Sequence, residues 1–275
     1  MRYVRKLPSF STVVTGAVMM FLYAPIVLVF INSFNSNEAL VRWGGFTTEW
    51  YKSAFNNDRV IDDLQTSLMV AVISTLFALV IAVTAGLWIR GATAKGQRVM
   101  DAATYMRIIL PEVVLAFAIF ILLTILDIRL GFWTVVVGHV IVNSAYATIV
   151  IQARLASLDG NIEEAARDLG ATPRRVFTRV TMPMLMPGVI VAGLLIFTFS
   201  FDNVVMSQFL GGASTETLPV LVLGMIRRNV TPEVNAIGVG IMLVMFISIA
   251  IAAAVTSFRP SGGSRIIGLE KKEDN

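Results

Sequence analysis

The sequence predicts an all-α integral membrane protein with six transmembrane helices, and two observations carry that prediction. Of the 275 residues, 56% are hydrophobic and only 15% are charged, which leaves too little polar surface for a water-soluble domain of this size. Six apolar runs are also long enough to cross a bilayer, which takes about 20 residues of helix. The chain has no cysteine, which excludes a disulfide scaffold, a cysteine-ligated zinc site and a thiol nucleophile.

The spans follow one another with short connections, and together they make one predicted membrane domain over residues 13–258. The first span follows a basic start, as in a signal peptide. Its apolar part is too long for one, however, and no small-residue cleavage site follows, so the span is expected to be retained. The six expected spans are Val13–Ile31, Gln65–Ile89, Tyr105–Leu126, Phe132–Gln152, Met184–Met206 and Val234–Phe258.

Lysine and arginine indicate the orientation of the spans, because cytoplasmic loops carry more of them than outer loops do. Sixteen of the 22 basic residues lie on or beside one set of flanks, which includes both termini and the loop 153–183. The sequence therefore predicts a cytoplasmic N-terminus (1–12), a cytoplasmic tail (259–275) and a cytoplasmic loop. The formal net charge of +4 then reflects topology, and no nucleic-acid partner is expected.

The loop between the fourth and fifth spans contains two predicted helices. Asn161 is a suitable N-cap for the first, with Glu164 at its third position as in a capping box. Glu163 and Arg167 lie four residues apart on one side of this helix, in the favourable order for an ion pair. Gly170 supplies the left-handed residue that ends the helix.

The second helix of this loop is predicted to begin after Thr172, with Pro173 at its first position. It is expected to stop near Met182–Pro183, where the fifth span begins. Most loops of this kind are solvated amphipathic connectors, which is the plainest interpretation. A DNA-binding helix-turn-helix is disfavoured because membrane spans directly precede and follow the segment.

This loop resembles the cytoplasmic signature of the permease subunits of binding-protein-dependent ABC importers, which reads E-A-A-x3-G-x9-I-x-L-P. Glu164, Ala165 and Ala166 are followed after three residues by Gly170. Nine residues later the sequence reads V-T-M-P, ending at Pro183. Valine for isoleucine and methionine for leucine are departures, but both keep the apolar character and the spacing is intact.

The resemblance implies the type I ABC importer permease fold in a bacterial inner membrane. It implies that the loop docks onto homodimeric ATPase subunits, and that a second homologous permease subunit and an extracytoplasmic solute-binding protein complete the transporter. The chain has no Gly-rich phosphate-binding loop. ATP and Mg are therefore expected on the partner ATPase, with no cofactor or metal in this chain, which is expected to be non-catalytic.

A narrower resemblance covers nearly the whole chain and points to the second permease subunit of the spermidine/putrescine importers. It implies a polyamine as the transported solute. The stretches that carry it are "YAPIVLVFINSFN", "GFTTEWY", "LPEVVLAFAIF", "LGFWTVVVGH", "EEAARDLGA" and "TPEVNA". Permeases for other small solutes share several of these stretches, so a permease for another solute is the alternative.

Two acidic residues, Glu112 and Asp202, lie within predicted spans. An ionisable group in a bilayer usually faces a cavity or a partner, and carboxylates suit a cationic solute. Related polyamine permeases carry acidic residues at these two positions and a tryptophan at the position of Trp50. The predicted substrate path comprises these three residues with Ser200 and Asn203. Asn203 is a departure, because close relatives often have a second aspartate there, and fewer negative charges weaken the attraction for a multiply charged cation.

Plainer roles are open for the polar residues of the spans. Asp202 could be an interfacial carboxylate in contact with headgroup water, and Glu112 a structural partner for a neighbouring helix. His139, the only histidine, is expected to pack with hydrogen bonds. Four glycines are expected to allow close helix packing, namely Gly86, Gly138, Gly188 and Gly193.

Two other classes of function are disfavoured. A secondary transporter commonly shows internal repeats and discontinuous helices near the midplane, and neither is evident in the sequence. An intramembrane serine protease would need a nucleophilic serine near His139, and no G-x-S-x-G motif is present.

Overall fold

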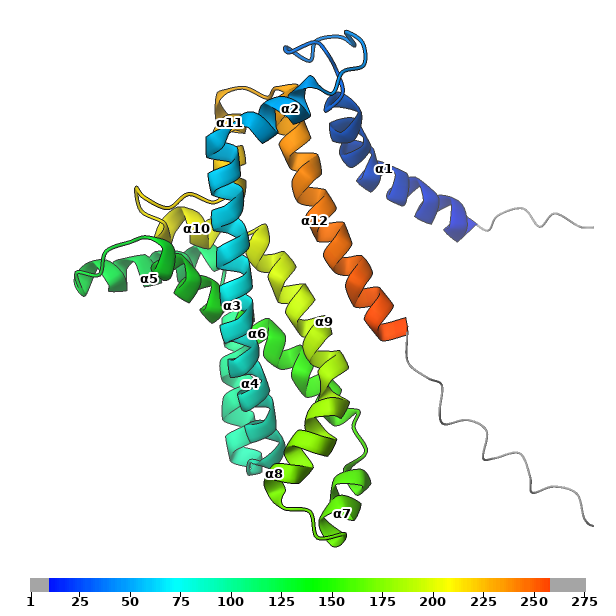
Figure 1. Cartoon of the computed structure of the whole chain (residues 1–275), viewed down its shortest axis with the longest axis vertical. Coiled ribbons are helices and arrows are strands. Elements are labelled where there is room, and N and C mark those ends of the chain that lie inside the picture. The colour runs from blue at the N-terminus through cyan, green and yellow to red at the C-terminus, as the bar shows by residue number, and fades with distance from the viewer. Residues whose placement is uncertain (1–9, 258–275) are drawn as a thin grey trace, which may run out of the picture.

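The computed structural model describes residues 10–257, which form an elongated helical molecule (Figure 1). Among these described residues, five helices are long and apolar enough to cross a membrane, and a sixth crossing requires a bent pair. The predicted all-α architecture is thus confirmed. Residues 1–9 and 258–275, which include most of the two predicted cytoplasmic ends, lie outside the described residues. The helices are α1 Phe10–Asn32, α2 Glu49–Asn56, α3 Asp58–Gly91, α4 Ala94–Ile109, α5 Glu112–Ile125, α6 Phe132–Ala156, α7 Gly160–Asp168, α8 Pro173–Val176, the π-helical turn η1 Phe177–Thr181, α9 Met182–Phe201, α10 Val205–Leu210, α11 Leu218–Arg228 and α12 Pro232–Ser257.

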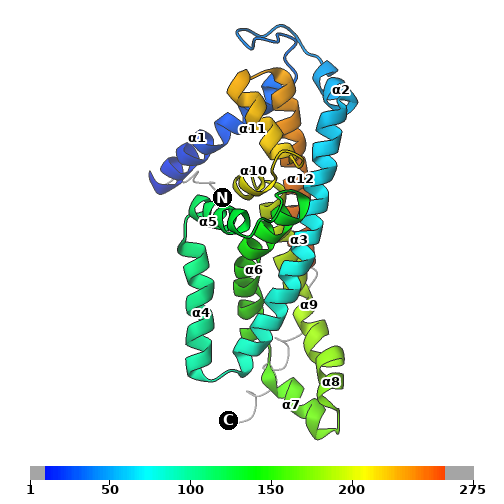
Figure 2. The same ribbon diagram turned by 90° about the vertical axis from the view of Figure 1, so that its left-hand side faces the viewer.

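The third expected span, Tyr105–Leu126, is not one straight helix, and that expectation was wrong. It is divided between α4 and α5, which meet at 101°, so that α5 turns across the top of α4 (Figure 2). Pro111 causes the break, because proline has no N–H to donate and disfavours helical backbone in the residue before it. Leu110 is accordingly extended, with φ −64° and ψ 128°. At about 1.5 Å per residue, the 14 residues of α5 are too short to cross a bilayer alone.

The helices α3, α6 and α9 form the centre of the molecule and share an apolar core. Small side chains make this close packing possible, and Ala78, Ala82, Ala147 and Ala192 are completely buried. All four glycines expected to allow close approach do so. A Cβ at any of them would lie against a side chain of a neighbouring helix, such as that of Arg154 for Gly188.

At the opposite extreme, α1 leaves the bundle at its α2 end and diverges from it (Figure 1). No residue of this helix is buried in its most apolar stretch, and α12 is the helix it packs against. Its apolar side chains therefore face outward on nearly every side, as suits a helix surrounded by lipid or by a partner's spans.

The short helix α7 lies at the far end of the molecule from α2 (Figure 1). Its N-cap is Asp159, whose carboxylate accepts a hydrogen bond from the Asn161 N–H at 3.0 Å. The expectation that Asn161 caps this helix was therefore wrong, because a stronger cap lies two residues earlier. Its C-terminal end is as predicted: Gly170 has φ +81°, and the Ala171 N–H bonds to the Ala166 carbonyl, as in a Schellman motif.

The second helix of the loop starts at Pro173 after Thr172, as predicted, but it does not stop before Pro183. It passes through η1 and continues as α9 to Phe201. In η1 the Met182 N–H bonds to the Phe177 carbonyl, five residues back. This wider turn makes room for Pro183, whose ring would clash with the preceding turn of an unbroken α-helix.

Candidate functional site

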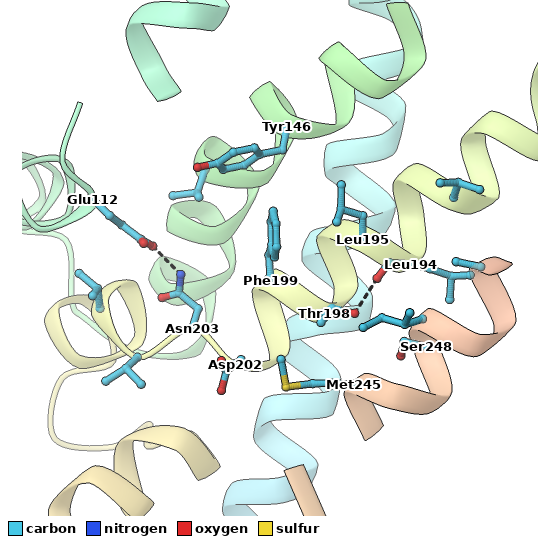
Figure 3. A pocket seen from close by; sticks show the side chains of 16 residues that line it. Glu112, Tyr146, Leu194, Leu195, Thr198, Phe199, Asp202, Asn203, Met245 and Ser248 are labelled. Carbon is cyan, nitrogen blue, oxygen red and sulfur yellow. Dashed lines mark hydrogen bonds between the residues drawn. The ribbon is translucent and has the colours of Figure 1, made fainter. Parts of the chain in front are cut away.

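A cavity of about 810 Å³ opens on one side of α9. Its walls come from α6, α9 and α12 and are mostly apolar, whereas one end carries three polar side chains, Glu112, Asp202 and Asn203. Figure 3 shows the side chains of Glu112 and Asn203 pointing toward one another, with Asp202 beside them. Three of the five residues predicted for the substrate path thus line one cavity, although Glu112 lies 90 and 91 positions from the other two.

The interruption of the helix between α9 and α10 positions Asp202 and Asn203. The α9 helix ends at Phe201, and Asp202 is its C-cap. Asn203 is held at both ends of its side chain: the amide oxygen accepts from the Met206 N–H at 2.8 Å, and the amide nitrogen donates to the Glu112 carboxylate. Glu112 in turn lies in the first turn of α5, directly after Pro111. Two helix breaks therefore bring the polar end of the cavity together.

The charged side chains that line this cavity are acidic, although Arg107 lies near enough to interact with Glu112 through its charge. Glu112 and Asp202 are its two ionisable groups apart from Tyr146, and no lysine or arginine lines it. Within residues 10–257, neither carboxylate forms an ion pair. Carboxylates in a bilayer are costly unless a partner or water compensates them, so this end of the cavity is suited to a positively charged group.

Behind the cavity lies a chain of buried polar side chains, which we call the His139 cluster: Ser74, His139, Ser200 and Ser207. The His139 Nδ1 is 2.6 Å from the Ser200 Oγ, and its Nε2 is 3.2 Å from the Ser207 Oγ. Ser200 also contacts Ser74, at 2.9 Å between the two oxygens. All four residues are at most 3% exposed. The predicted packing role of His139 with hydrogen bonds is confirmed.

The His139 cluster connects to the polar end of the cavity, because the Ser207 Oγ donates to the Asn203 carbonyl at 2.9 Å. The cluster thus holds the backbone of Asn203, in the segment between α9 and α10, while Glu112 holds the side chain of the same residue. Sequence reasoning did not foresee this connection, since the serines lie on three different helices and no local pattern marks them.

The other two residues of the predicted path lie elsewhere. Ser200 is buried and faces His139, and it is not among the residues that line the cavity. Trp50 lies on α2 and donates its indole N–H to the Asn35 carbonyl at 2.8 Å. Conversely, Tyr146 lines the cavity and packs edge-to-face on Phe199. The sequence does not predict a place for Tyr146 in the cavity, because a single tyrosine in an apolar run does not indicate a site.

The predicted coupling residues gather on and after α7. Glu164, Ala165 and Gly170 are exposed and Ala166 is half-buried, while Pro183 lies exposed at the start of α9. Two large apolar side chains, Ile162 in this helix and Leu169 at its C-cap, are 45% and 89% exposed. An exposed helix with small and apolar side chains is suited to dock against another protein surface.

Glu163, the neighbour of the predicted coupling residues, faces the other way. Its Oε1 accepts from the Arg90 Nη1 at 2.9 Å and from the Thr181 Oγ at 2.8 Å. Partial burial opposes the charged form, but these two hydrogen bonds and the charges of Arg90 and Arg167 lower the pKa of Glu163 below its ordinary value. The expected pairing with Arg167 thus contributes through charge, while Arg90, 73 residues away, makes the direct contact.

A family model described as the binding-protein-dependent transport system inner membrane component matches residues 78–259. The chain belongs to this family. The matched region includes α7, the polar end of the cavity and the whole His139 cluster except Ser74. This permease chain is therefore an inner-membrane component of a transport system and is not itself an enzyme.

Individual relatives agree with the family. The permease chain is 34% identical over 237 residues to the spermidine/putrescine transport system permease protein PotC of Escherichia coli, covering 86% of this chain and 89% of PotC. It is 35% identical over 225 residues to the putrescine transport system permease protein PotI of the same species, covering 79% and 80% of the two chains.

Solved structures show that the fold is that of the ABC importer permeases. A chain of a bacterial ABC transporter that imports the acidic polysaccharide alginate aligns with a TM-score of 0.67 at 16% identity, over 90% of this chain and 95% of that one. Because that transporter carries an anionic polymer, the shared fold does not determine the charge of the solute.

Proposed function

We propose that this chain is one transmembrane half of an ATP-driven importer for polyamines such as spermidine and putrescine. The observation that carries the proposal is a mostly apolar cavity with two carboxylates and no basic residue, in a chain whose relatives are named for these solutes. The other parts are a second homologous permease subunit, homodimeric ATPase subunits that bind ATP and Mg, and an extracytoplasmic solute-binding protein.

The chemistry of the cavity matches that of a polyamine, which alternates ammonium groups with short methylene chains. An ammonium can pair with Glu112 or Asp202, while the apolar walls from α6, α9 and α12 accept the methylene groups. Asn203 holds the Glu112 carboxylate in place through its amide, so this carboxylate is already oriented before a cation arrives. Preorientation of this kind lowers the cost of binding.

Uptake assays with cavity variants test the solute. Asp202→Asn removes one negative charge with little change in shape, and we expect uptake of putrescine or spermidine to fall by about tenfold or more, the equivalent of ~1.4 kcal/mol. Asp127→Asn is the matched control, because Asp127 lies in the loop after α5 with φ +54°, a conformation that asparagine also accepts. Unchanged polyamine uptake by Asp202→Asn, or loss of a neutral solute instead, would refute the polyamine proposal.

We further propose that Glu164, Ala165, Ala166, Gly170 and Pro183 form the contact with the ATPase. The substitution Ala166→Trp adds bulk to the docking surface and should weaken co-purification of the ATPase and reduce transport. Gly170→Val should reduce transport through the backbone as well, because φ at Gly170 is +81°, which a β-branched residue adopts only at a cost of ~1–2 kcal/mol, while a Cβ there meets nothing of this chain within 4 Å. Wild-type transport and ATPase binding by Ala166→Trp would show that the loop is only a connector.

A further inference from the structure

One carboxylate oxygen joins three separate elements at the α7 end of the molecule. The Glu163 Oε1 of α7 accepts hydrogen bonds from Arg90, in the last turn of α3, and from Thr181, the last residue of η1. We call these three residues the Glu163 joint. It bridges the predicted docking helix to two of the three helices that form the core of the molecule.

Thr181 is the last residue of the π-helical turn η1. A π turn takes up an extra residue relative to an α-helical turn and so rotates the side chains that follow it. Thr181 is only 5% exposed, and its hydroxyl donates to the Glu163 carboxylate. Such turns inside α-helices occur frequently at functional sites, and this one lies directly between α8 and α9.

Around the joint, α7 is not packed tightly against the spans. A cavity of about 430 Å³ separates them, lined by the joint itself and by residues of α3, α7, α8 and η1. The side chains of Arg90 and Glu163 are 33% and 15% exposed. The ion pair is therefore partly shielded from water, which makes it stronger than a fully exposed pair. A movement of α7 can thus reach α3 and α9 through this charged contact.

We propose that Glu163 is a positioning residue for energy coupling, which fixes α7 to α3 and α9 so that displacement of α7 by the ATPase moves both spans together. The inference rests on the proposed function of α7 as the ATPase contact. It assigns two roles to neighbouring residues of α7: Glu164 and the residues after it bind the ATPase, and Glu163, which contacts Arg90 and Thr181, transmits the movement inward.

The test uses the whole transporter reconstituted in vesicles with its ATPase and binding protein, and it measures transport and ATP hydrolysis separately. For Glu163→Ala we expect the ATPase to co-purify as with the wild type, while solute transported per ATP hydrolysed falls about fivefold or more, the lower end of coupling between distant sites. Asp168→Ala is the matched control, because Asp168 is an exposed acidic residue of the same helix outside the joint.

Two further variants separate coupling from folding. Thr181→Val removes only the hydroxyl and keeps the shape, so it should lower coupling in the same direction with normal assembly. Combining Glu163→Arg with Arg90→Glu remakes the ion pair in reverse and should recover transport per ATP relative to Glu163→Arg alone. A purely local stabilising role predicts no such recovery in the ratio of transport to hydrolysis.

The outcomes distinguish this inference from the proposed function. Wild-type coupling by Glu163→Ala in a transporter that Ala166→Trp inactivates would overturn the positioning role and leave the docking role intact. Loss of ATPase co-purification by Glu163→Ala would also overturn it, because Glu163 would then belong to the docking surface. If Ala166→Trp has no effect, the proposed ATPase contact itself fails.

Discussion

The His139 cluster and the Glu163 joint are both polar contacts between helices, but they differ in charge and burial. The cluster consists of an imidazole and three hydroxyls that are almost completely buried. The joint consists of an ion pair and a hydroxyl beside a cavity, with Arg90 one-third exposed.

A neutral buried network resists change because each broken bond leaves an unpaired polar group in an apolar medium. A partly exposed ion pair can move together with the helices that it joins at lower cost, because water compensates its charges during the movement. The comparison predicts a rigid half around the His139 cluster and a movable α7 end.

The largest effect is expected from breaking the His139 cluster. His139→Ala leaves the hydroxyls of Ser200 and Ser207 without their present partner and opens a space in the core, which should lower the free energy of unfolding by about 2–4 kcal/mol. Thermal unfolding of the detergent-solubilised complex measures it. Thr124→Ala is the control, because the Thr124 hydroxyl is exposed and bonds only within its own helix, to Phe120. Equal stability of the two variants would contradict a rigid cluster.

A smaller effect is expected at the seam between α6 and α9, which lies between the two polar contacts. Arg154 donates from its Nε to the Met184 carbonyl at 3.1 Å, and its side chain crosses the face of Gly188 so closely that a Cβ there would overlap it. Gly188→Ala should therefore destabilise the protein by about 1–3 kcal/mol.

The matched control for this seam is Gly224→Ala in α11, where a Cβ meets nothing within 4 Å. Alanine there should be neutral or slightly stabilising, because it favours helix by ~1 kcal/mol over glycine. Unfolding temperatures of the two variants measure the difference. If Gly188→Ala proves as harmless as Gly224→Ala, the rigid half does not extend to this contact between α6 and α9.

The smallest expected effect is the pH dependence of stability that comes from the charge of Glu163, a charge that the His139 cluster lacks. The pKa of Glu163 is lowered from its ordinary value of 4.5, because the hydrogen bonds and charges around it outweigh the effect of burial. A carboxylate with a lowered folded pKa contributes its stabilisation in full above the unfolded value and loses it as the pH falls through the folded value. The wild type should therefore be slightly more stable than Glu163→Gln at pH 7, and this advantage should decline as the pH falls below 4.5 and vanish once the pH is below the lowered folded pKa. An advantage that persists there would show that the charge of Glu163 is not what holds the joint.

Much of the architecture could be predicted because its causes are local. Long apolar runs mark the spans, Gly170 marks the end of α7, and Pro173 marks the start of α8. The errors arise where two local signals compete: Asp159 is a better-placed cap than Asn161, and Pro111 breaks a run that is apolar enough to span. Pro183 was expected to end a helix, but a π turn just before it lets the helix continue.

The sites were predicted unevenly for a related reason. Glu112, Asp202 and Asn203 stand out because charged or amide side chains are rare in apolar segments, and the structure brings them to one cavity. The contacts of Glu163 with Arg90 and of His139 with Ser207 join residues 73 and 68 positions apart. No periodicity or spacing in a single sequence carries such information, since it depends on how the helices cross.

The isolation of α1 has a consequence for how the protein is made. The helix it packs against, α12, begins about 200 residues after α1 ends. At a synthesis rate of ~5–20 residues per second, α1 leaves the ribosome roughly 10–40 s before α12 exists. During that time the membrane itself has to hold α1, and a mean hydropathy of 2.4 with apolar side chains on all sides suits it to that role. The first span is therefore suited to insert into the bilayer independently, and the last span packs against it there after synthesis is complete.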